Sequence, residues 1–262
     1  MRALLIKLGG SLLTDKERPE TAHAERIERL AGEIAEAREA AEGRGERIVL
    51  GHGSGSFGHV AAASAGLARG PLDPRNLPGA SRTQERAAEL HRLILEALRA
   101  DGLAPFSLAP SSFLLSDGGT TVERFLSPLA HALHLGLLPV VYGDVVLDKS
   151  WGVSIASTEA VLLEVAAGLP ALGIEISRTL WLGETEGVYD ARGATIPYLA
   201  NLEEAAIGAA RGTDVTGGMR LRLETCLALA RRGVPSAILD GRAPGRLVAA
   251  IRGEEVPGTR IG

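Results

Sequence analysis

Short apolar segments alternate with longer amphipathic segments along this 262-residue chain. The short segments suit strands, whereas the longer ones place apolar residues at helical spacing, as Leu90, Ile94 and Leu98 do. Strands separated by helices are typical of a mainly parallel sheet covered on both faces, because parallel neighbours need crossover connections. The alternation therefore predicts an α/β fold, a three-layer αβα sandwich with a mainly parallel central sheet. No break in composition marks a linker, and a single domain over 1–262 is expected.

The individual elements follow from this periodicity. Strands are expected at 3–8, 47–50, 137–144, 178–183 and 236–240. Helices are expected at 24–42, 82–100, 122–136, 158–169, 217–233 and 245–253. Two apolar runs flank Lys149 and Ser150, which predicts a β-hairpin over 145–156.

Charge and cysteine content exclude several classes of protein. The formal net charge is −4, so nothing in the composition indicates a nucleic-acid partner. Cys226 is the single cysteine, which leaves no disulfide framework and no cysteine-based zinc site. No apolar run reaches the length of a membrane span, and the N-terminal stretch is too short and glycine-bounded for a signal peptide. We therefore expect a cytoplasmic protein without a membrane or nucleic-acid partner.

Glycine-rich segments follow several of the predicted strands, where parallel sheets bind their ligands. They lie at 7–11, 51–58, 142–144 and 182–187, and a fifth, 214–219, opens a predicted helix. Glycine lets backbone N–H groups approach an anion, and a helix N-terminus adds positive potential. Several such loops, two of them next to Lys or Arg, favour a phosphate ligand. None fits the P-loop pattern, and the G-x-G-x-x-G within 51–58 lacks an acid at the expected distance.

Seven stretches of the chain carry a family resemblance. In chain order they read KLGGS, GHGSGSFGH, SLAPSSF, PVVYGDVVLD, EGVYD, DVTGGM and GEEVPGTRI. Together they resemble the isopentenyl phosphate kinase family, in the amino-acid kinase superfamily. The resemblance implies transfer of the γ-phosphate of ATP to isopentenyl phosphate, with Mg²⁺, in isoprenoid biosynthesis. It also implies a homodimer, with an acceptor-binding lobe at approximately 1–150 and a nucleotide-binding lobe at approximately 151–262.

The stretch GHGSGSFGH is expected to hold the acceptor phosphate. The residues expected at the acceptor are Gly53, Ser54, Gly55, His59 and Gly143. The backbone N–H groups of the first three can form an anion cradle. By resemblance His59, on the turn into the next helix, donates to an acceptor oxygen; the alternative is that it caps a helix starting near Val60. His52 is expected to pack or support the site, and His91 to have no chemical role.

Lysine is rare in this chain, with only Lys7, Lys16 and Lys149 among 28 basic residues. Lysines retained in such a chain suit places where a compact ammonium is needed instead of a planar guanidinium. By resemblance Lys7 bridges the donor and acceptor phosphates, Lys16 also touches phosphate, and Asp144 orients Lys7 or supports the site. The expected catalytic residues are thus Lys7, Lys16, His59 and Asp144.

The nucleotide site is also inferred from the resemblance. The residues expected to bind ATP are Lys7, Gly9, Gly10, Ser11, Lys16, Gly183, Gly187, Gly217, Gly218 and Arg222. Mg²⁺ is expected to be held mainly by phosphates and water, so no protein ligand is named. Three positions depart from the family pattern: Glu159 and Glu186 stand where the family tends to have Asp, and Arg222 where it has Lys. Each keeps its charge.

Two other functions are compatible with these residues. A kinase on the same scaffold could act on fosfomycin or another alkyl phosphate, because the residues around His59 recognise only the head of the acceptor. The pocket for its tail would decide, and it is expected between the helices at 59–68, 82–100 and 122–136. A catalytically weak nucleotide-binding sensor is the third possibility, which the retention of Lys7, His59 and Asp144 argues against.

Overall fold

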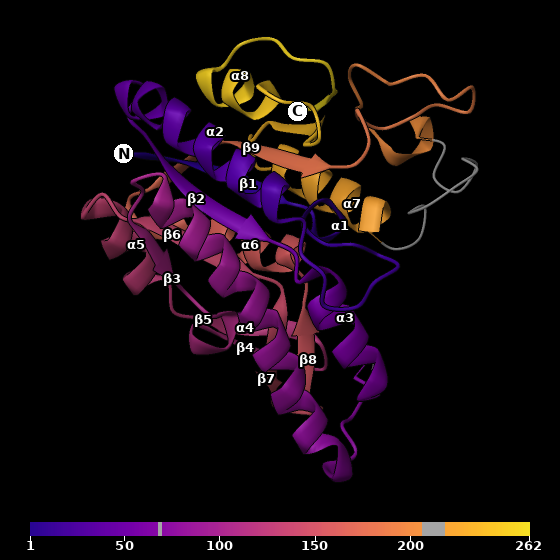
Figure 1. The fold of residues 1–262 in the computed structure, drawn as a ribbon. Coiled ribbons are helices and arrows are strands. Elements are labelled where there is room, and N and C mark those ends of the chain that lie inside the picture. The colour runs from indigo at the N-terminus through magenta and orange to yellow at the C-terminus, as the bar shows by residue number, and fades with distance from the viewer. Residues whose placement is uncertain (68–69, 206–217) are drawn as a thin grey trace.

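The computed structural model describes residues 1–67, 70–205 and 218–262. Among these residues, a seven-stranded sheet has the order β11-β10-β9-β1-β2-β6-β3 (Figure 1). Its neighbouring strands are parallel apart from the antiparallel pair β10 and β11. The strands are β1 (Arg2–Leu8), β2 (Glu46–His52), β3 (Pro105–Ser107), β6 (Leu138–Tyr142), β9 (Glu175–Gly183), β10 (Ser236–Asp240) and β11 (Thr259–Ile261). The predicted α/β fold with a mainly parallel central sheet is therefore confirmed.

Helices lie on both faces of this sheet. They are α1 (Gly10–Leu13), α2 (Ala24–Gly43), α3 (Gly55–Ser64), α4 (Leu77–Ala100), α5 (Ser127–His134), α6 (Thr158–Gly168), α7 (Gly218–Ala230) and α8 (Arg246–Arg252). Short 3₁₀ turns occur at Pro74–Asn76, Pro110–Ser112, Leu169–Leu172 and Leu202–Glu204. Figure 1 shows α2 and α4 crossing the near face of the sheet.

The alternation of side chains along β1 builds two separate cores. Leu4 and Ile6 pack with α2, α4 and α8, whereas Ala3 and Leu5 pack with α5, α6 and α7. Because successive side chains of a strand point to opposite faces, Lys7 falls on the same face as Ala3 and Leu5. The apolar pattern of the strand therefore directs this lysine toward α6 and α7.

A second, four-stranded sheet has the order β5-β4-β7-β8 among the described residues. Its strands are β4 (Leu114–Asp117), β5 (Thr120–Arg124), β7 (Asp144–Asp148) and β8 (Gly152–Ala156). The predicted hairpin is confirmed, since Asp144 pairs antiparallel with Ala156. The helix predicted over 122–136 was wrong in its first part, because β-branched residues extend that segment against β4. The helix α5 begins only at Ser127, where Pro128 takes a first-turn position that needs no N–H donor.

The loops after β1 and β2 pass each other with no room for side chains. A Cβ on Gly10 would lie 2.7 Å from the nitrogen of Gly55, and one on Gly53 would lie 2.7 Å from the nitrogen of Gly10. Gly55 has φ +53°, and a Cβ there would overlap Thr14 Oγ1. That hydroxyl accepts a hydrogen bond of 2.9 Å from Ser56 N, which satisfies a free donor in the first turn of α3.

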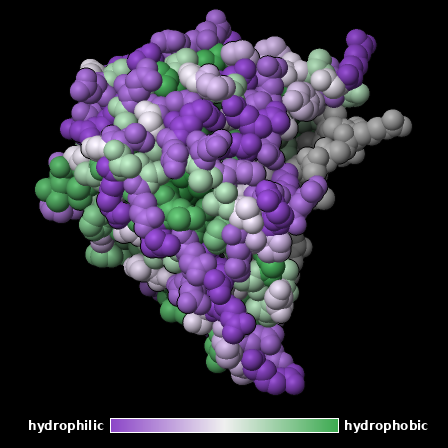
Figure 2. All heavy atoms as spheres, viewed as in Figure 1, coloured by the Kyte–Doolittle hydropathy of each residue, from purple (hydrophilic) through white to green (hydrophobic). Residues whose placement is uncertain are grey.

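The surface seen in Figure 2 is mostly hydrophilic, with hydrophobic residues in small separate groups. None of the described helices is long and apolar enough to cross a membrane. Three exposed hydrophobic side chains, Val60, Ile155 and Leu221, line the cleft that holds the predicted site.

The packing of these loops predicts a selective loss of stability at Gly55. Gly55→Ala is expected to lower the free energy of unfolding by at least about 2 kcal/mol, from positive-φ strain and the clash with Thr14. The matched control is Gly43→Ala, since a Cβ on Gly43 would meet nothing within 4 Å. That change should be neutral or stabilising by up to about 1 kcal/mol. Urea unfolding measures both, and equal effects would contradict the packing argument.

Candidate active site

A cleft of about 850 Å³ gathers most of the predicted site residues. It opens where β1 and β2 end, beside the first turns of α3, α6 and α7. Figure 1 shows the arrowheads of β2 and β9 pointing toward the edge where α1, α3 and α7 meet. The predicted residues that line the cleft are Lys7, Gly10, Ser11, Lys16, Gly53, Ser54, Gly55, His59, Gly143, Asp144, Gly218 and Arg222.

The remaining predicted residues have other positions. Gly9 and Gly183 lie behind the lining, against the guanidinium of Arg222. Gly187 packs on Thr259, whose hydroxyl accepts a hydrogen bond of 2.8 Å from Val188 N. Gly217 and the rest of 206–217, which includes most of the DVTGGM stretch, lie outside the described residues.

Three buried charged side chains from three elements meet in the cleft. Lys7 Nζ donates to Glu159 Oε1 at 2.8 Å, and Arg222 Nε lies 4.0 Å from the same oxygen. Glu159 lies in the first turn of α6, which Ser157 caps by accepting from Ala160 N at 3.1 Å. Burial pushes the pKa of Glu159 upward, but the charges of Lys7 and Arg222 hold it below its ordinary value. One carboxylate thus orients Lys7 by a hydrogen bond and faces Arg222, and the three side chains together carry one net positive charge.

Glu159 is a site residue that the sequence-based prediction did not include. The signal was present, since an acid follows a Ser cap in the first turn of a helix after a predicted strand end. It was treated only as a departure from the family pattern. Thr14, whose hydroxyl joins α1 to the first turn of α3, gave no signal in the sequence.

Arg222 is buried, in contrast to its neighbour Arg220. The side chain of Arg222 is 8% exposed, and its Nε has no hydrogen-bond partner among the described residues. A Cβ on Gly183 would lie 2.8 Å from its guanidinium, so this glycine makes room for the arginine. Arg220 is 67% exposed and pairs with Glu224 at 2.8 Å. The two arginines therefore differ in burial, in partner and in the room reserved for them.

Backbone N–H groups at the start of α3 face the cleft, although Gly53 contributes none. Its N–H donates to Leu8 O at 3.0 Å, which corrects the prediction that it belongs to the anion cradle. Among the described residues, no acceptor is bound to the N–H groups of Ser54 and Gly55, the N-cap and first residue of α3. Gly53 is there because the loops pass so closely, and the next two residues carry the free donors.

His59 is exposed within α3, on the lining of the cleft. The prediction placed it on the turn before a helix, and the alternative made it the cap of a helix starting near Val60. Both positions were wrong, because α3 begins at Gly55 with Ser54 as its N-cap. The early start is stabilised by the hydroxyl of Thr14, which binds Ser56 N. His59 is therefore free of a capping role.

Asp144 is a buried acid with one unpaired oxygen. Its Oδ1 accepts from Val145 N at 2.7 Å, while no donor reaches Oδ2 among the described residues. Burial raises the pKa of Asp144 to about 7, because the hydrogen bonds it makes only partly offset the loss of solvent. The neighbouring Gly143 N donates to His52 O at 3.1 Å. The two acids of the cleft thus differ: Glu159 is held ionised by its cations, whereas Asp144 titrates near neutral pH.

Lys16 lies at the rim of the cleft. Its Nζ is 3.4 Å from Glu184 Oε2, and the lysine side chain is 38% exposed. Arg26 approaches the other oxygen of Glu184 at 3.6 Å. Glu186, two residues on, accepts from Thr195 Oγ1 at 2.7 Å. The acids of the GETEG segment therefore serve different partners, one at the rim and one within its own loop.

Small and apolar side chains form part of the cleft lining. They are Val60, Ala62, Thr83, Ala87, Ile155, Ala156 and Leu221. The prediction placed a pocket for the acceptor's tail between the helices at 59–68, 82–100 and 122–136. The helices α3 and α4 contribute residues to the cleft lining, but 122–136 contributes none among the described residues, whereas Ile155 of β8 does. The cause is the missed second sheet, which inserts its hairpin here.

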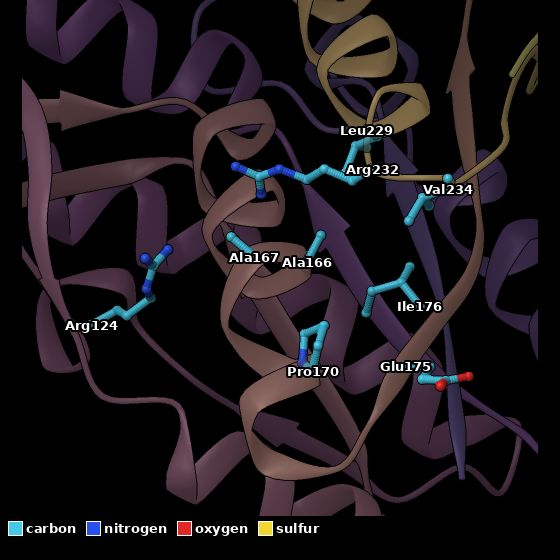
Figure 3. Close-up of a pocket in the computed structure, with 10 residues that line it drawn as sticks. Arg124, Ala166, Ala167, Pro170, Glu175, Ile176, Leu229, Arg232 and Val234 are labelled. Carbon is cyan, nitrogen blue, oxygen red and sulfur yellow. The ribbon is translucent and has the colours of Figure 1, made fainter.

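A second hollow, of about 500 Å³, lies at the other end of the strands (Figure 3). Its lining includes Glu175 and Ile176 at the start of β9, with Arg124 and Arg232 at its edges. In Figure 3 the two arginines approach from different elements, on either side of α6. None of the predicted site residues lines this hollow, so the predicted chemistry belongs to the cleft at the carboxyl ends.

Comparison with known proteins shows which families and structures this chain is similar to. The sequence profile described as Amino acid kinase family matches residues 2–240. The isopentenyl phosphate kinase of Methanothermobacter thermautotrophicus is 31% identical, over 98% of this chain and 98% of that protein. That of Haloferax volcanii is 34% identical, over 100% and 99%. A crystal structure of isopentenyl phosphate kinase superposes with a TM-score of 0.85, at 28% identity and full coverage of both chains.

The buried state of Asp144 predicts a pH-dependent stability difference. The folded pKa is about 7 against an ordinary value of 3.8, so this group's stabilising contribution is complete below pH 3.8 and is lost as pH rises through about 7. Asp144→Asn removes the titration. Relative to the unchanged protein, the variant should therefore gain unfolding free energy between pH 5 and pH 8. Urea unfolding at both pH values checks this, and parallel pH dependences would refute the raised pKa.

Proposed function

This chain belongs to the amino acid kinase family and, within it, to the isopentenyl phosphate kinases, and we propose that it transfers the γ-phosphate of ATP to isopentenyl phosphate. An oxygen of the acceptor phosphate attacks the γ-phosphorus, and the bond to the β–γ bridging oxygen breaks. The products are isopentenyl diphosphate and ADP. The observation that carries the proposal is one cleft that joins the Lys7–Glu159–Arg222 cluster to free N–H groups and a histidine on α3.

Charge stabilisation is the main task of such a site. Two anions must approach each other, and negative charge spreads over the transferring group. Lys7 is a compact cation whose position is set by Glu159, so its charge needs no reorganisation when the reaction occurs. It lines the same cleft as the start of α3 and Arg222. We assign Lys7 to the phosphates on both sides of the reaction.

The acceptor phosphate is assigned to the start of α3. Ser54 and Gly55 supply free N–H groups at a helix N-terminus, where the helix dipole favours an anion. His59 follows one turn later on the same helix and donates to an acceptor oxygen. The apolar wall beyond it, with Val60 and Ile155, suits a branched hydrocarbon tail. This wall favours isopentenyl phosphate over fosfomycin, because fosfomycin is small and polar and would leave the apolar wall exposed to water.

The phosphates of ATP are assigned to the other side of Lys7. Arg222 presents a buried guanidinium that suits two phosphate oxygens, and Lys16 reaches the rim. Gly10, Ser11 and Gly218 also line the cleft. Mg²⁺ bound to ATP would neutralise phosphate charge and would be held mainly by phosphate and water. We also propose that the protein is a cytoplasmic homodimer and that each subunit has two lobes divided near residue 150. Light scattering can test the dimer.

The direct experiment is an acceptor panel with labelled ATP and Mg²⁺. Isopentenyl phosphate should be converted to the diphosphate faster than fosfomycin or other alkyl phosphates. Faster turnover of fosfomycin would favour the alternative acceptor. ATP binding without turnover of any acceptor would favour a nucleotide sensor.

His59 is predicted to act in the reaction rather than in the fold. His59→Ala should lower kcat/KM by about 100-fold or more, the range for a lost donor to developing charge. His59→Gln keeps a donor and should lose less. Because His59 is exposed and is not a cap, neither change should alter thermal stability much. Near-native kinetics in the alanine variant would mean that the backbone donors hold the phosphate alone.

Arg222 is predicted to bind ATP. Arg222→Ala should weaken ATP binding and lower kcat, while the KM for the acceptor changes much less. Arg222→Lys should retain part of the activity, since a lysine can still provide a point charge. The matched control is Arg220→Ala, on the same helix but exposed and paired with Glu224. Equal, small effects of the two alanine changes would show that Arg222 does not touch the nucleotide.

A further inference from the structure

A stack of three aromatic rings is buried beneath the acceptor side of the cleft. His52 ends β2, His91 comes from α4, and Tyr142 ends β6. The His91 and Tyr142 ring centroids are 4.2 Å apart, and those of His52 and Tyr142 are 5.5 Å apart with the planes 7° from parallel. His52 is fully buried and His91 is 4% exposed. Neither histidine lines the cleft, and the predicted reaction uses neither.

Hydrogen bonds connect these histidines to the anion cradle. Nδ1 of His52 lies 3.1 Å from the carbonyl oxygen of Gly53, and its Nε2 lies 2.8 Å from Nδ1 of His91. Nε2 of His91 lies 2.8 Å from Oγ of Ser107. The chain of contacts therefore runs from a surface serine on β3, through two buried rings, to the residue before Ser54.

The hydrogen bond to the carbonyl oxygen of Gly53 determines the direction of the other hydrogen bonds between His52, His91 and Ser107. A carbonyl oxygen only accepts, so Nδ1 of His52 must carry its proton. Burial holds the pKa of His52 at about 3 and that of His91 at about 4, so both rings are neutral near pH 7. Nε2 of His52 then accepts from Nδ1–H of His91, and Nε2 of His91 accepts from the hydroxyl of Ser107. Both histidines are thereby fixed as the Nδ1–H tautomer.

The hydrogen bond from His52 Nδ1 to Gly53 O fixes the orientation of the peptide group between Gly53 and Ser54. In a trans peptide the carbonyl of Gly53 and the N–H of Ser54 point in opposite directions. The carbonyl points to the fully buried ring of His52, so the N–H points the other way, toward the cleft that Ser54 lines. The backbone of His52 is also held, since its carbonyl accepts from Thr158 Oγ1 at 2.7 Å and from Gly143 N.

We propose that His52 and His91 are positioning residues that aim the Ser54 N–H at the acceptor phosphate. Ser107, His91 and His52 form a hydrogen-bond relay, in which each residue donates to the next and His52 donates to the carbonyl oxygen of Gly53. The relay holds the Ser54 N–H in position before the acceptor binds. The proposal rests on the proposed function for the identity of the anion, but the relay itself is a property of the protein alone.

The relay is tested first without any activity measurement. Nitrogen-15 spectra of the histidine rings at pH 7 should show two neutral Nδ1–H tautomers with slowly exchanging ring protons. His91→Phe should remove one of these signals and shift the other, which assigns them. Finding either ring as the Nε2–H tautomer, or charged, would overturn the relay whatever the enzyme catalyses.

The positioning role is tested by kinetics. His52→Leu removes the donor to Gly53 and should raise the KM for isopentenyl phosphate by about 10-fold, the value of one hydrogen bond to a charged group. The KM for ATP should change less than about 2-fold, an amount worth under 0.5 kcal/mol. His52→Asn places an amide N–H near the position of Nδ1–H and should restore most of the loss. An equal rise in both KM values, or no rescue by Asn, would reduce His52 to a packing residue.

Two controls separate positioning from stability and from the proposed function. Leu98→Ala removes a buried side chain elsewhere on α4 and should lower the midpoint of urea unfolding while leaving both KM values unchanged. If no acceptor is turned over, the affinity for inorganic phosphate is measured instead of KM, in the unchanged protein and in His52→Leu. Weaker phosphate binding in the variant would support the positioning role, and equal binding would overturn it.

Discussion

The site is organised around the buried ion pair between Lys7 and Glu159. Removing both charges from water is costly, and the cost is offset by their direct contact at 2.8 Å and by the charge of Arg222, which faces the same carboxylate. The pair joins the end of β1 to the first turn of α6, and Arg222 adds α7 to the same point. Because two cations share one anion, a positive charge is left over in a place where water is scarce. That surplus is what a pair of phosphates requires.

The backbone is as important to this site as the side chains. The loops after β1 and β2 are in direct contact, so Gly10, Gly53 and Gly55 are needed for packing before any ligand is considered. Of the three N–H groups first assigned to the acceptor, that of Gly53 is already used by Leu8. The donors of Ser54 and Gly55 remain because they open a helix. Glycine-rich loops therefore mark the place of the site, while the hydrogen-bond pattern identifies its donors.

Errors in the sequence-based prediction trace to contacts made by distant segments. Residues 122–124 were assigned to a helix because the residues after them have helical spacing, but pairing with β4 makes them part of a strand. The same missed sheet supplies Ile155 to the cleft in place of the helix that was expected. His59 was placed before a helix because nothing in the local sequence shows that Thr14 stabilises the first turn of α3. Local patterns cannot report a hydrogen bond made from another loop.

The sequence by itself determined the fold class, five of the seven strands described in the central sheet and the motifs that indicate phosphate chemistry, because strand periodicity and glycine spacing are local properties. The two edge strands β3 and β11 are only three residues long and were not predicted. It also directed Lys7 toward one face, since alternation along β1 leaves no other choice. Only the tertiary structure decided which acid holds Lys7, why Arg222 is buried when Arg220 is not, and how His52 meets His91. Each depends on where separate elements pack in space, and charge, burial and hydrogen-bond direction are set by those neighbours.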